Sequence, residues 1–196
     1  MMPPLVRLLV LATLVAAPAA CSSPDGPSTD PSFTILRMGP DAPPLETLDT
    51  AFWAVRGQDR EVQVRYESPT YGYGKCLRLV VPAQALPAGV APGDSVRITV
   101  HVVSPELFQF DFGPAGLKFD PSHPAQLQIR YTFADPDLNG DGQVDARDQN
   151  LAKRLAIYRR ETSHDPWERL PTTLDANAIE ADAEVTGFTQ YALASE

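Results

Sequence analysis

The chain has 196 residues, with 25 acidic against 16 basic side chains and a formal net charge of −9. No cluster of lysine and arginine could neutralise a row of phosphates, so the composition excludes a nucleic-acid partner. Proline occupies 20 of the 196 positions, about twice its usual frequency, which disfavours long helices.

The N-terminus has the pattern of a secretory signal over residues 1–20. Arg7 precedes an apolar run from Leu8 to Ala20, which is shorter than the ~20 residues that a membrane-spanning helix needs. The end of the run, Ala19-Ala20-Cys21, resembles a bacterial lipoprotein signal, although Pro18 stands where such signals usually carry leucine. The resemblance implies cleavage before Cys21 and lipidation of its sulfur. The alternative is an ordinary secretory signal cut after Ala20.

The rest of the chain is expected to form a tether and one domain. Residues 21–32 are rich in Ser, Pro, Asp and Gly and predict a flexible linker. Residues 33–196 are enough for a single packed domain. With Cys21 lipidated, Cys76 has no partner for a disulfide, and its strand-like surroundings predict a buried, inert thiol.

Alternation of apolar and polar residues predicts strands along most of the domain. Over Ser95–Val103, for example, four apolar side chains alternate with polar ones, which places them on one face of a strand. About ten strands separated by short turns favour two antiparallel sheets packed as a β-sandwich. The predicted strands are 33–38, 51–56, 60–66, 76–81, 95–103, 108–112, 127–133, 155–160, 167–170 and 183–194.

Several short motifs between Gly93 and Ala194 occur in the order seen in bacterial secreted domains similar to ZU5. The central one is the turn "FGPAGLKFD" beginning at Phe112, and the others include Ile129 with Tyr131, Trp167, and Phe188-Thr189 with Tyr191. The resemblance implies a β-sandwich interaction module without catalytic chemistry. Some animal relatives cut their own chain at a His-Phe-Ser site, but here Gly187 replaces that histidine, so self-cleavage is not expected.

An acidic segment, "DPDLNGDGQVDARDQNL", carries five aspartates within the insertion 135–150. It matches the calcium loop pattern, in which oxygen ligands stand at positions 1, 3, 5, 7, 9 and 12 and glycine at 6. Gly142 fills position 6, and Val144 at position 8 is expected to point inward. A short helix is expected over 146–154. The predicted ligands of Ca²⁺ are Asp137, Asn139, Asp141, Gln143 through its carbonyl, Asp145 and Asp148.

Aspartate at position 12 makes the loop similar to that of a dockerin, although a dockerin has two such loops and this chain has one. Cohesin binding is therefore not expected, and a structural clamp is the favoured role for calcium. The alternative is a solvated hairpin tip, because Asn139-Gly140 and Asp141-Gly142 are also favoured turn dipeptides.

These patterns favour an extracytoplasmic lipoprotein that binds a protein or glycan partner and is not an enzyme. The resemblance to lipoprotein signals, with Ser22 after Cys21, implies the outer membrane. A carbohydrate-binding module is the alternative, with Tyr71 and Tyr73, and also Trp53 and Trp167, as a stacking platform. A secreted hydrolase is the weakest hypothesis, since the three histidines, His101, His123 and His164, lie in no catalytic motif. Nothing in the sequence indicates an oligomer.

Overall fold

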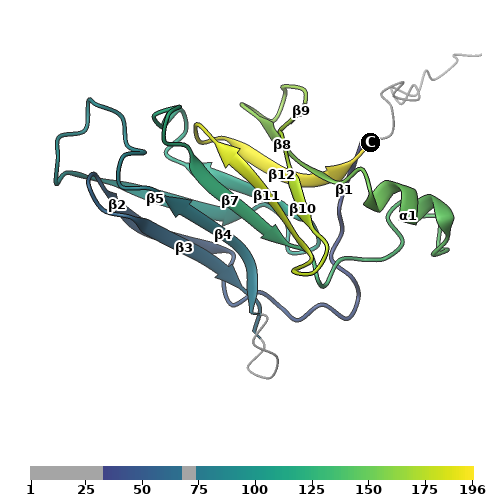
Figure 1. Ribbon diagram of the computed structural model, residues 1–196. Coiled ribbons are helices and arrows are strands. Elements are labelled where there is room, and N and C mark those ends of the chain that lie inside the picture. The colour runs from purple at the N-terminus through teal and green to yellow at the C-terminus, as the bar shows by residue number, and fades with distance from the viewer. Residues whose placement is uncertain (1–32, 68–73) are drawn as a thin grey trace, which may run out of the picture. The chain divides into compact units, whose positions relative to one another are not determined.

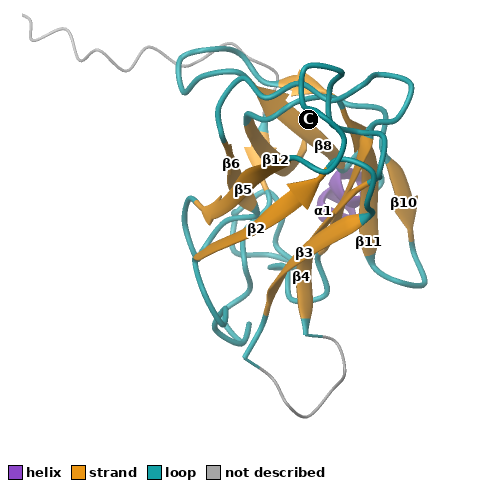
Figure 2. Ribbon diagram, turned by 90° about the vertical axis from the view of Figure 1, so that its left-hand side faces the viewer, coloured by secondary structure: helices purple, strands orange, loops and turns teal. Residues whose placement is uncertain are grey.

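A computed structural model describes residues 33–67 and 74–196 of the chain, and the described part is an all-β domain with one short helix. Two antiparallel sheets face each other, which confirms the predicted β-sandwich (Figures 1 and 2). One sheet has seven strands, with β2, β5, β6, β12, β8 and β9 in order and β1 paired to β12; the other has five, in the order β10, β11, β7, β4, β3.

The strands are short and follow one another with few long connections. Their bounds are β1 Thr34–Ile35, β2 Asp49–Val55, β3 Arg60–Arg65, β4 Lys75–Val81, β5 Ser95–Val102, β6 Gln109–Gly113, β7 Ala125–Arg130, β8 Ala156–Arg160, β9 Glu168–Arg169, β10 Thr173–Asp175, β11 Glu180–Val185 and β12 Gln190–Ser195. The helix α1 spans Ala146–Ala152, within the range that the sequence predicted.

The core lies between the sheets and is filled by the apolar residues of the alternating pattern. On β5, Ile98, Val100 and Val102 are almost fully buried, while Arg97 and His101 on the opposite face are exposed. Period-two alternation therefore has the predicted consequence, because successive side chains of a strand point to opposite faces of the sheet. Phe112, Phe188 and Tyr191 pack ring against ring at the centre of this core.

The segment before Gly93, which the ZU5-like motifs do not cover, is part of the same sandwich. β2 pairs with β5 over seven residues, and β3 pairs with β4, which in turn pairs with β7. β1 pairs with β12, so the first described strand lies beside the last strand of the chain.

Three sequence expectations about strands were wrong in detail. The predicted strand 183–194 is two strands, β11 and β12, which belong to different sheets because the chain crosses between the layers over residues 186–189. β7 ends at Arg130, and Tyr131 and Phe133 lie in the turn that follows. The short strand β10 was not predicted, since a three-residue run has too few positions to show alternation.

A search of the described residues for a helix long and apolar enough to cross a membrane found none.

Candidate functional site

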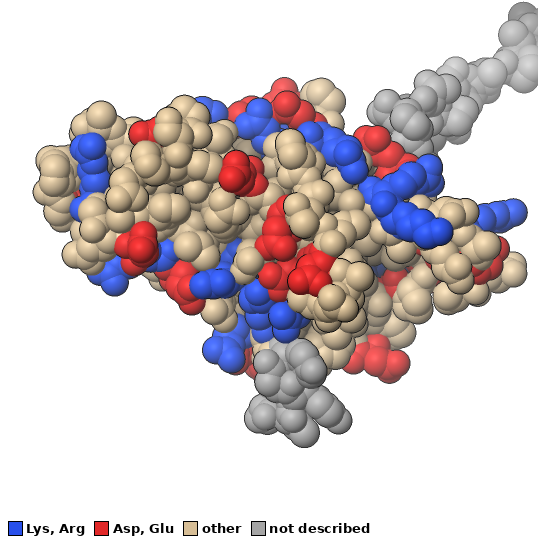
Figure 3. Space-filling view, viewed as in Figure 1, with Lys and Arg blue, Asp and Glu red and all other residues tan. Residues whose placement is uncertain are grey.

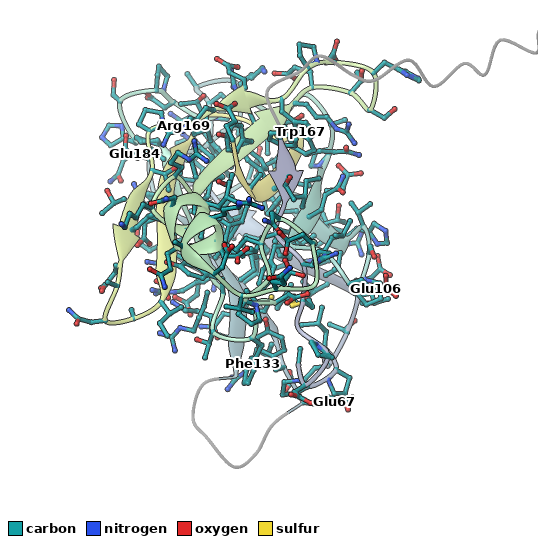
Figure 4. The ribbon with its side chains drawn as sticks, turned by 90° about the vertical axis from the view of Figure 1, so that its right-hand side faces the viewer. Glu67, Glu106, Phe133, Trp167, Arg169 and Glu184 are labelled. Atoms are coloured by element: carbon teal, nitrogen blue, oxygen red, sulfur yellow. The ribbon has the colours of Figure 1, made fainter. Side chains whose placement is uncertain are left out.

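The aspartate-rich segment connects the two sheets. It leaves β7 of the five-stranded sheet after Arg130 and enters β8 of the seven-stranded sheet at Ala156. A hairpin joins two neighbouring strands of one sheet, so this segment is not a hairpin turn. We call residues 135–148 the aspartate loop; its last three residues are the first three of α1, and Figure 4 looks onto this helix, with Phe133 below it in the view.

Asp137, at position 1 of the loop pattern, is the acceptor around which the first half of the loop winds. Its Oδ1 accepts the amides of Gly140 at 2.7 Å and Asp141 at 3.2 Å, and its Oδ2 accepts the amide of Gly142 at 2.8 Å. Gly140 and Gly142 have φ of 74° and 83°, a conformation that only glycine adopts without strain. The sharp turn that the sequence predicted at Gly142 is present.

Asp148, at position 12, closes the second half of the loop. Its Oδ1 accepts the amides of Leu138 at 2.8 Å and Asn139 at 3.2 Å, and its Oδ2 accepts the amide of Asp145 at 2.8 Å. The side chain is buried. These amides, that of Asp145 above all, hold the pKa of Asp148 below its usual range, because they stabilise the charged carboxylate.

Asp145, at position 9, caps the helix that leaves the loop. Its carboxylate accepts the amide of Arg147 at 2.7 Å while its own amide bonds to Asp148, and the two residues together form a capping box. The loop and α1 are therefore one hydrogen-bonded unit. An aspartate in the first turn also lies favourably with respect to the helix dipole.

The residues at positions 3, 5 and 7 form the exposed rim of the loop. Asn139 accepts the amide of Asp141 at 2.8 Å and donates to its carboxylate at 3.0 Å, and Asp141 accepts the amide of Gln143 at 2.9 Å. The side chain of Gln143 is exposed. The backbone of Gln143 is thus held in place by its neighbour, as a carbonyl ligand requires.

The expectation that Val144 anchors the loop was wrong, because this side chain is 65% exposed. The anchors are instead Leu138, which packs against the main core, and Leu151 of α1, which is buried. Val144 borders an open, mostly apolar cavity of about 280 Å³ whose other walls include Leu36 and Leu155. In paired calcium loops a second loop covers the side chain at position 8. Here the described residues contain one such loop, so Val144 stays exposed.

Arg37 and Arg147 contact the loop, and the sequence predicted neither contact. The Arg37 guanidinium lies 3.2 Å from the Asp135 carboxylate and 4.0 Å from that of Asp137, and it donates to the Asp137 carbonyl at 3.1 Å. Arg147 lies 3.5 Å from the Asp141 carboxylate. Arg37 is about 100 residues away in sequence, so only the pairing of β1 with β12 and the path of the following chain bring it here. Three of the five aspartates, Asp135, Asp137 and Asp141, thus lie within 4.0 Å of a guanidinium.

The chemistry of the donor set suits a hard divalent cation. Carboxylate, amide and carbonyl oxygens are the ligands that Ca²⁺ takes in proteins, and they follow one another here in the order of a calcium loop. Within residues 33–67 and 74–196, however, no group of three or more His, Cys, Asp or Glu side chains is gathered closely enough to hold a metal ion. The carboxylates of Asp137 and Asp148 are instead bonded to the loop's own amides. A carboxylate offers about four acceptor positions, so each of these two has an acceptor position left.

The other residues singled out in the sequence have separate places. Cys21, Tyr71 and Tyr73 lie outside the described residues. Cys76 is fully buried, and burial raises the pKa of its thiol to about 12, so the thiol stays protonated and unreactive. Trp167 is covered on both sides, since Phe33 stacks on it at 5.6 Å and the Arg160 guanidinium lies 4.4 Å from its ring centre.

Of the histidines, His101 contacts Asp49 at 2.8 Å and His123 faces Asp120 at 3.8 Å, each on the exposed surface. His164 lies in the exposed turn before Trp167.

Compared with known protein families, with characterised proteins and with solved structures, the chain finds no match.

Proposed function

We propose that this chain is a lipid-anchored, extracytoplasmic β-sandwich whose aspartate loop binds one calcium ion, and that it acts as a non-catalytic interaction or structural module of the bacterial envelope. The observation that carries the proposal is the closure of the loop by Asp137 and Asp148, positions 1 and 12 of the calcium pattern, around glycines at the required turn. The ZU5-like order of motifs between Gly93 and Ala194 supports the non-catalytic role.

Calcium would supply positive charge at the centre of a loop that carries five aspartates, three of which are contacted by Arg37 or Arg147. Asp137, Asn139, Asp141, the Gln143 carbonyl, Asp145 and Asp148 are the residues that would hold it. Because the loop joins the two sheets, ordering it fixes one sheet relative to the other at this end of the core. Calcium would therefore stabilise the fold, and the single loop favours this structural role over a switch.

The direct test is thermal unfolding of the purified chain after EDTA treatment, with and without added calcium. A ligand at 100 times its Kd stabilises the native state by about 2.7 kcal/mol, and for a domain of this size each kcal/mol shifts Tm by roughly 2–4 °C. We expect Tm to rise by about 5–10 °C with calcium and less with magnesium at the same concentration.

Matched variants separate a bound ion from general electrostatic effects. Asp137→Asn and Asp141→Asn keep the shape of the side chain and should abolish the calcium-dependent rise. Asp175→Asn is the control, because Asp175 also accepts two backbone amides, at 2.8 and 3.0 Å, but is the exposed last residue of β10, outside the aspartate loop. A calcium shift that is absent from the wild-type chain, or that survives in Asp137→Asn, contradicts the calcium part of the proposal.

The lipid anchor is tested separately. When the chain is expressed in a Gram-negative host, labelled palmitate should be incorporated into the wild-type protein and the protein should partition into detergent. Cys21→Ala should lose both properties. Incorporation of label into Cys21→Ala, or a wild-type chain recovered without label, counts against a lipoprotein.

A further inference from the structure

Trp53 is an exposed tryptophan at one edge of the seven-stranded sheet. It lies on β2 and is 58% exposed, although a large aromatic side chain is normally well buried. Its neighbours Phe52 and Ala54 point toward the core, so alternation directs Trp53 to the outer face of the sheet. Figure 2 shows β2, β5 and β6 side by side at this edge. We call the outer face of these three strands the Trp53 face.

A row of small residues crosses the three strands next to the tryptophan, and we call this row the floor of the Trp53 face. Ala51 lies on β2 two residues before Trp53 and directly opposite Thr99 of β5. Thr99 in turn lies opposite Gly113 of β6. A Cβ atom at Gly113 would overlap the Thr99 hydroxyl, so the Thr99 side chain lies over the glycine. Three small residues in one row across the strands leave Trp53 standing above its surroundings.

Polar side chains border this floor on both sides. Arg97 stands directly opposite Trp53, and no carboxylate of the described residues lies within ion-pair distance of it. On the far side, Asp49 and His101 are opposite each other and bonded at 2.8 Å, and Asp111 of β6 stands opposite His101. The two borders are four residues apart along β2, which is about 13 Å at the usual rise of a strand.

The second tryptophan of the same sheet shows what a structural tryptophan looks like in this protein. Trp167 has Phe33 on one side and Arg160 on the other, and it belongs to a small cluster with Tyr158. Trp53 contacts no aromatic ring among the described residues. Packing therefore explains Trp167 and leaves the open face of Trp53 without an explanation.

The size of the apolar area decides what kind of ligand fits. A tryptophan side chain buries at most about 250 Å², whereas a stable protein–protein interface covers about 800 Å² on each partner and has an apolar centre. On the outer face beside Trp53, Val55 is the other larger apolar side chain of β2, and β5 presents Arg97 and Thr99. This face therefore lacks the apolar area for a second copy of the chain or another folded protein. One flat aromatic ring with hydrogen-bonding groups about 13 Å away suits a small, hydroxyl-rich ligand.

We propose that the Trp53 face binds a neutral oligosaccharide. A pyranose ring has an apolar C–H face, which packs on the indole, and hydroxyl groups at its edge, which pair with carboxylates, imidazole and guanidinium. Trp53 stacks against one sugar ring, Arg97 donates to its hydroxyls, and Asp49, His101 and Asp111 pair with a neighbouring sugar lying across the floor. The site is independent of the aspartate loop, and binding does not require calcium.

The test uses the purified full-length chain in a detergent without a sugar headgroup. It is titrated with four soluble probes, chitotetraose, cellotetraose, xylotetraose and mannotetraose, while tryptophan fluorescence and binding heat are recorded in the presence of EDTA. We expect saturable binding of at least one of the four. Trp53→Ala should weaken it by at least about tenfold, and Trp53→Phe, which keeps an aromatic face, should weaken it less.

Controls distinguish the outcomes. Trp167→Phe should leave the affinity unchanged, and Arg97→Ala should reduce it several-fold. Circular dichroism of Trp53→Ala checks that the fold is intact; if it is not, the comparison is made between Trp53→Phe and Arg97→Ala. The proposal is overturned if none of the four sugars binds at millimolar concentration or if Trp53→Ala binds as tightly as the wild type. It is also overturned if sedimentation shows a wild-type dimer that Trp53→Ala dissociates, since the face would then be an interface between copies.

Discussion

The two sheets of this domain present very different outer faces to solvent. On the five-stranded sheet, polar side chains pair with one another across the strands: Lys75 and Arg130 lie 2.6 and 3.4 Å from the Glu180 carboxylate, and Gln128 donates to Asp182 at 2.8 Å. Figure 3 shows basic and acidic side chains interspersed on this side of the domain. On the seven-stranded sheet, one end is covered by Phe33 and Trp167, and the other end leaves Trp53 and Arg97 open.

The difference indicates which face is structural and which is available for binding. Partly buried groups that bond to each other across strands, such as Glu180 with Lys75 and Arg130, stabilise the sheet and have little capacity left for a ligand. The Asp49–His101 pair of the Trp53 face is different, because both side chains are more than half exposed and can still bond to a ligand. Exposed groups without a neighbour to bond to add little to stability, and their hydrogen-bonding and stacking positions remain available to a ligand. The first kind of residue should therefore affect unfolding when it is changed, and the second kind should affect binding.

The largest expected effect is on the five-stranded sheet, from Glu180→Gln. The Glu180 side chain is 7% exposed, and the substitution leaves the charges of Lys75 and Arg130 without their shared carboxylate. Breaking a fully buried pair costs 3–5 kcal/mol; the two cations here are about a fifth exposed, so we expect about 2 kcal/mol.

In thermal unfolding this corresponds to a fall in Tm of about 4–8 °C. Glu184→Gln is the control, because Glu184 lies on the same outer face of β11, four residues along the strand, and is exposed; its effect should stay within about 0.5 kcal/mol. Equal effects of the two substitutions would show that the Glu180 ion pairs contribute nothing to the fold.

The second prediction compares the two tryptophans of the seven-stranded sheet. Trp167→Ala removes the contacts with Phe33 and Arg160 and should destabilise the chain by about 2 kcal/mol. Trp53→Ala removes an exposed ring and should change the free energy of unfolding by less than about 0.5 kcal/mol. Chemical denaturation of both variants measures the difference, and a Trp53→Ala variant as unstable as Trp167→Ala would assign Trp53 a packing role.

The smallest effect concerns Asp182, whose pKa is raised, mainly by burial and further by the nearby Glu180 charge. A raised pKa in the folded state means that ionisation costs stability: the contribution is fully present below the unfolded pKa and is lost as the pH rises through the folded pKa. Asp182→Asn cannot ionise and still accepts a hydrogen bond from Gln128. It should therefore be slightly more stable than the wild type at pH 7.

Unfolding at several pH values checks the sign. The advantage of Asp182→Asn should shrink as the pH falls and vanish below about pH 3.9, the usual pKa of an unfolded aspartate. An advantage that grows toward low pH would mean that Asp182 is stabilised in its charged form.

Much of the fold was predictable from local patterns. Alternation along Ser95–Val102 and over Leu127–Ile129 placed the correct side chains in the core, because the period of a strand is fixed by its backbone. The calcium pattern located the glycine turn at Gly142 and the helix after Asp145 for the same reason, since both depend on neighbours within a few residues.

Other features depended on residues that are distant in sequence. The approach of Arg37 to Asp135, the exposure of Val144 and the covering of Trp167 by Phe33 have no local signal. Each follows from which strands pair: β1 with β12 brings Phe33 and Arg37 to their partners, and the crossing from β7 to β8 orients the aspartate loop.

The sequence by itself determined the class of fold, the inward face of most strands and the internal order of the aspartate loop, because these depend on the geometry of a short piece of backbone. The tertiary structure decided which tryptophan is covered and which is open, which carboxylates share a cation, and that the loop joins two sheets. Those properties arise only when strands that are far apart in the chain pair with each other. The free energy that stabilises such pairing comes from burial of the whole core and not from any short stretch of sequence.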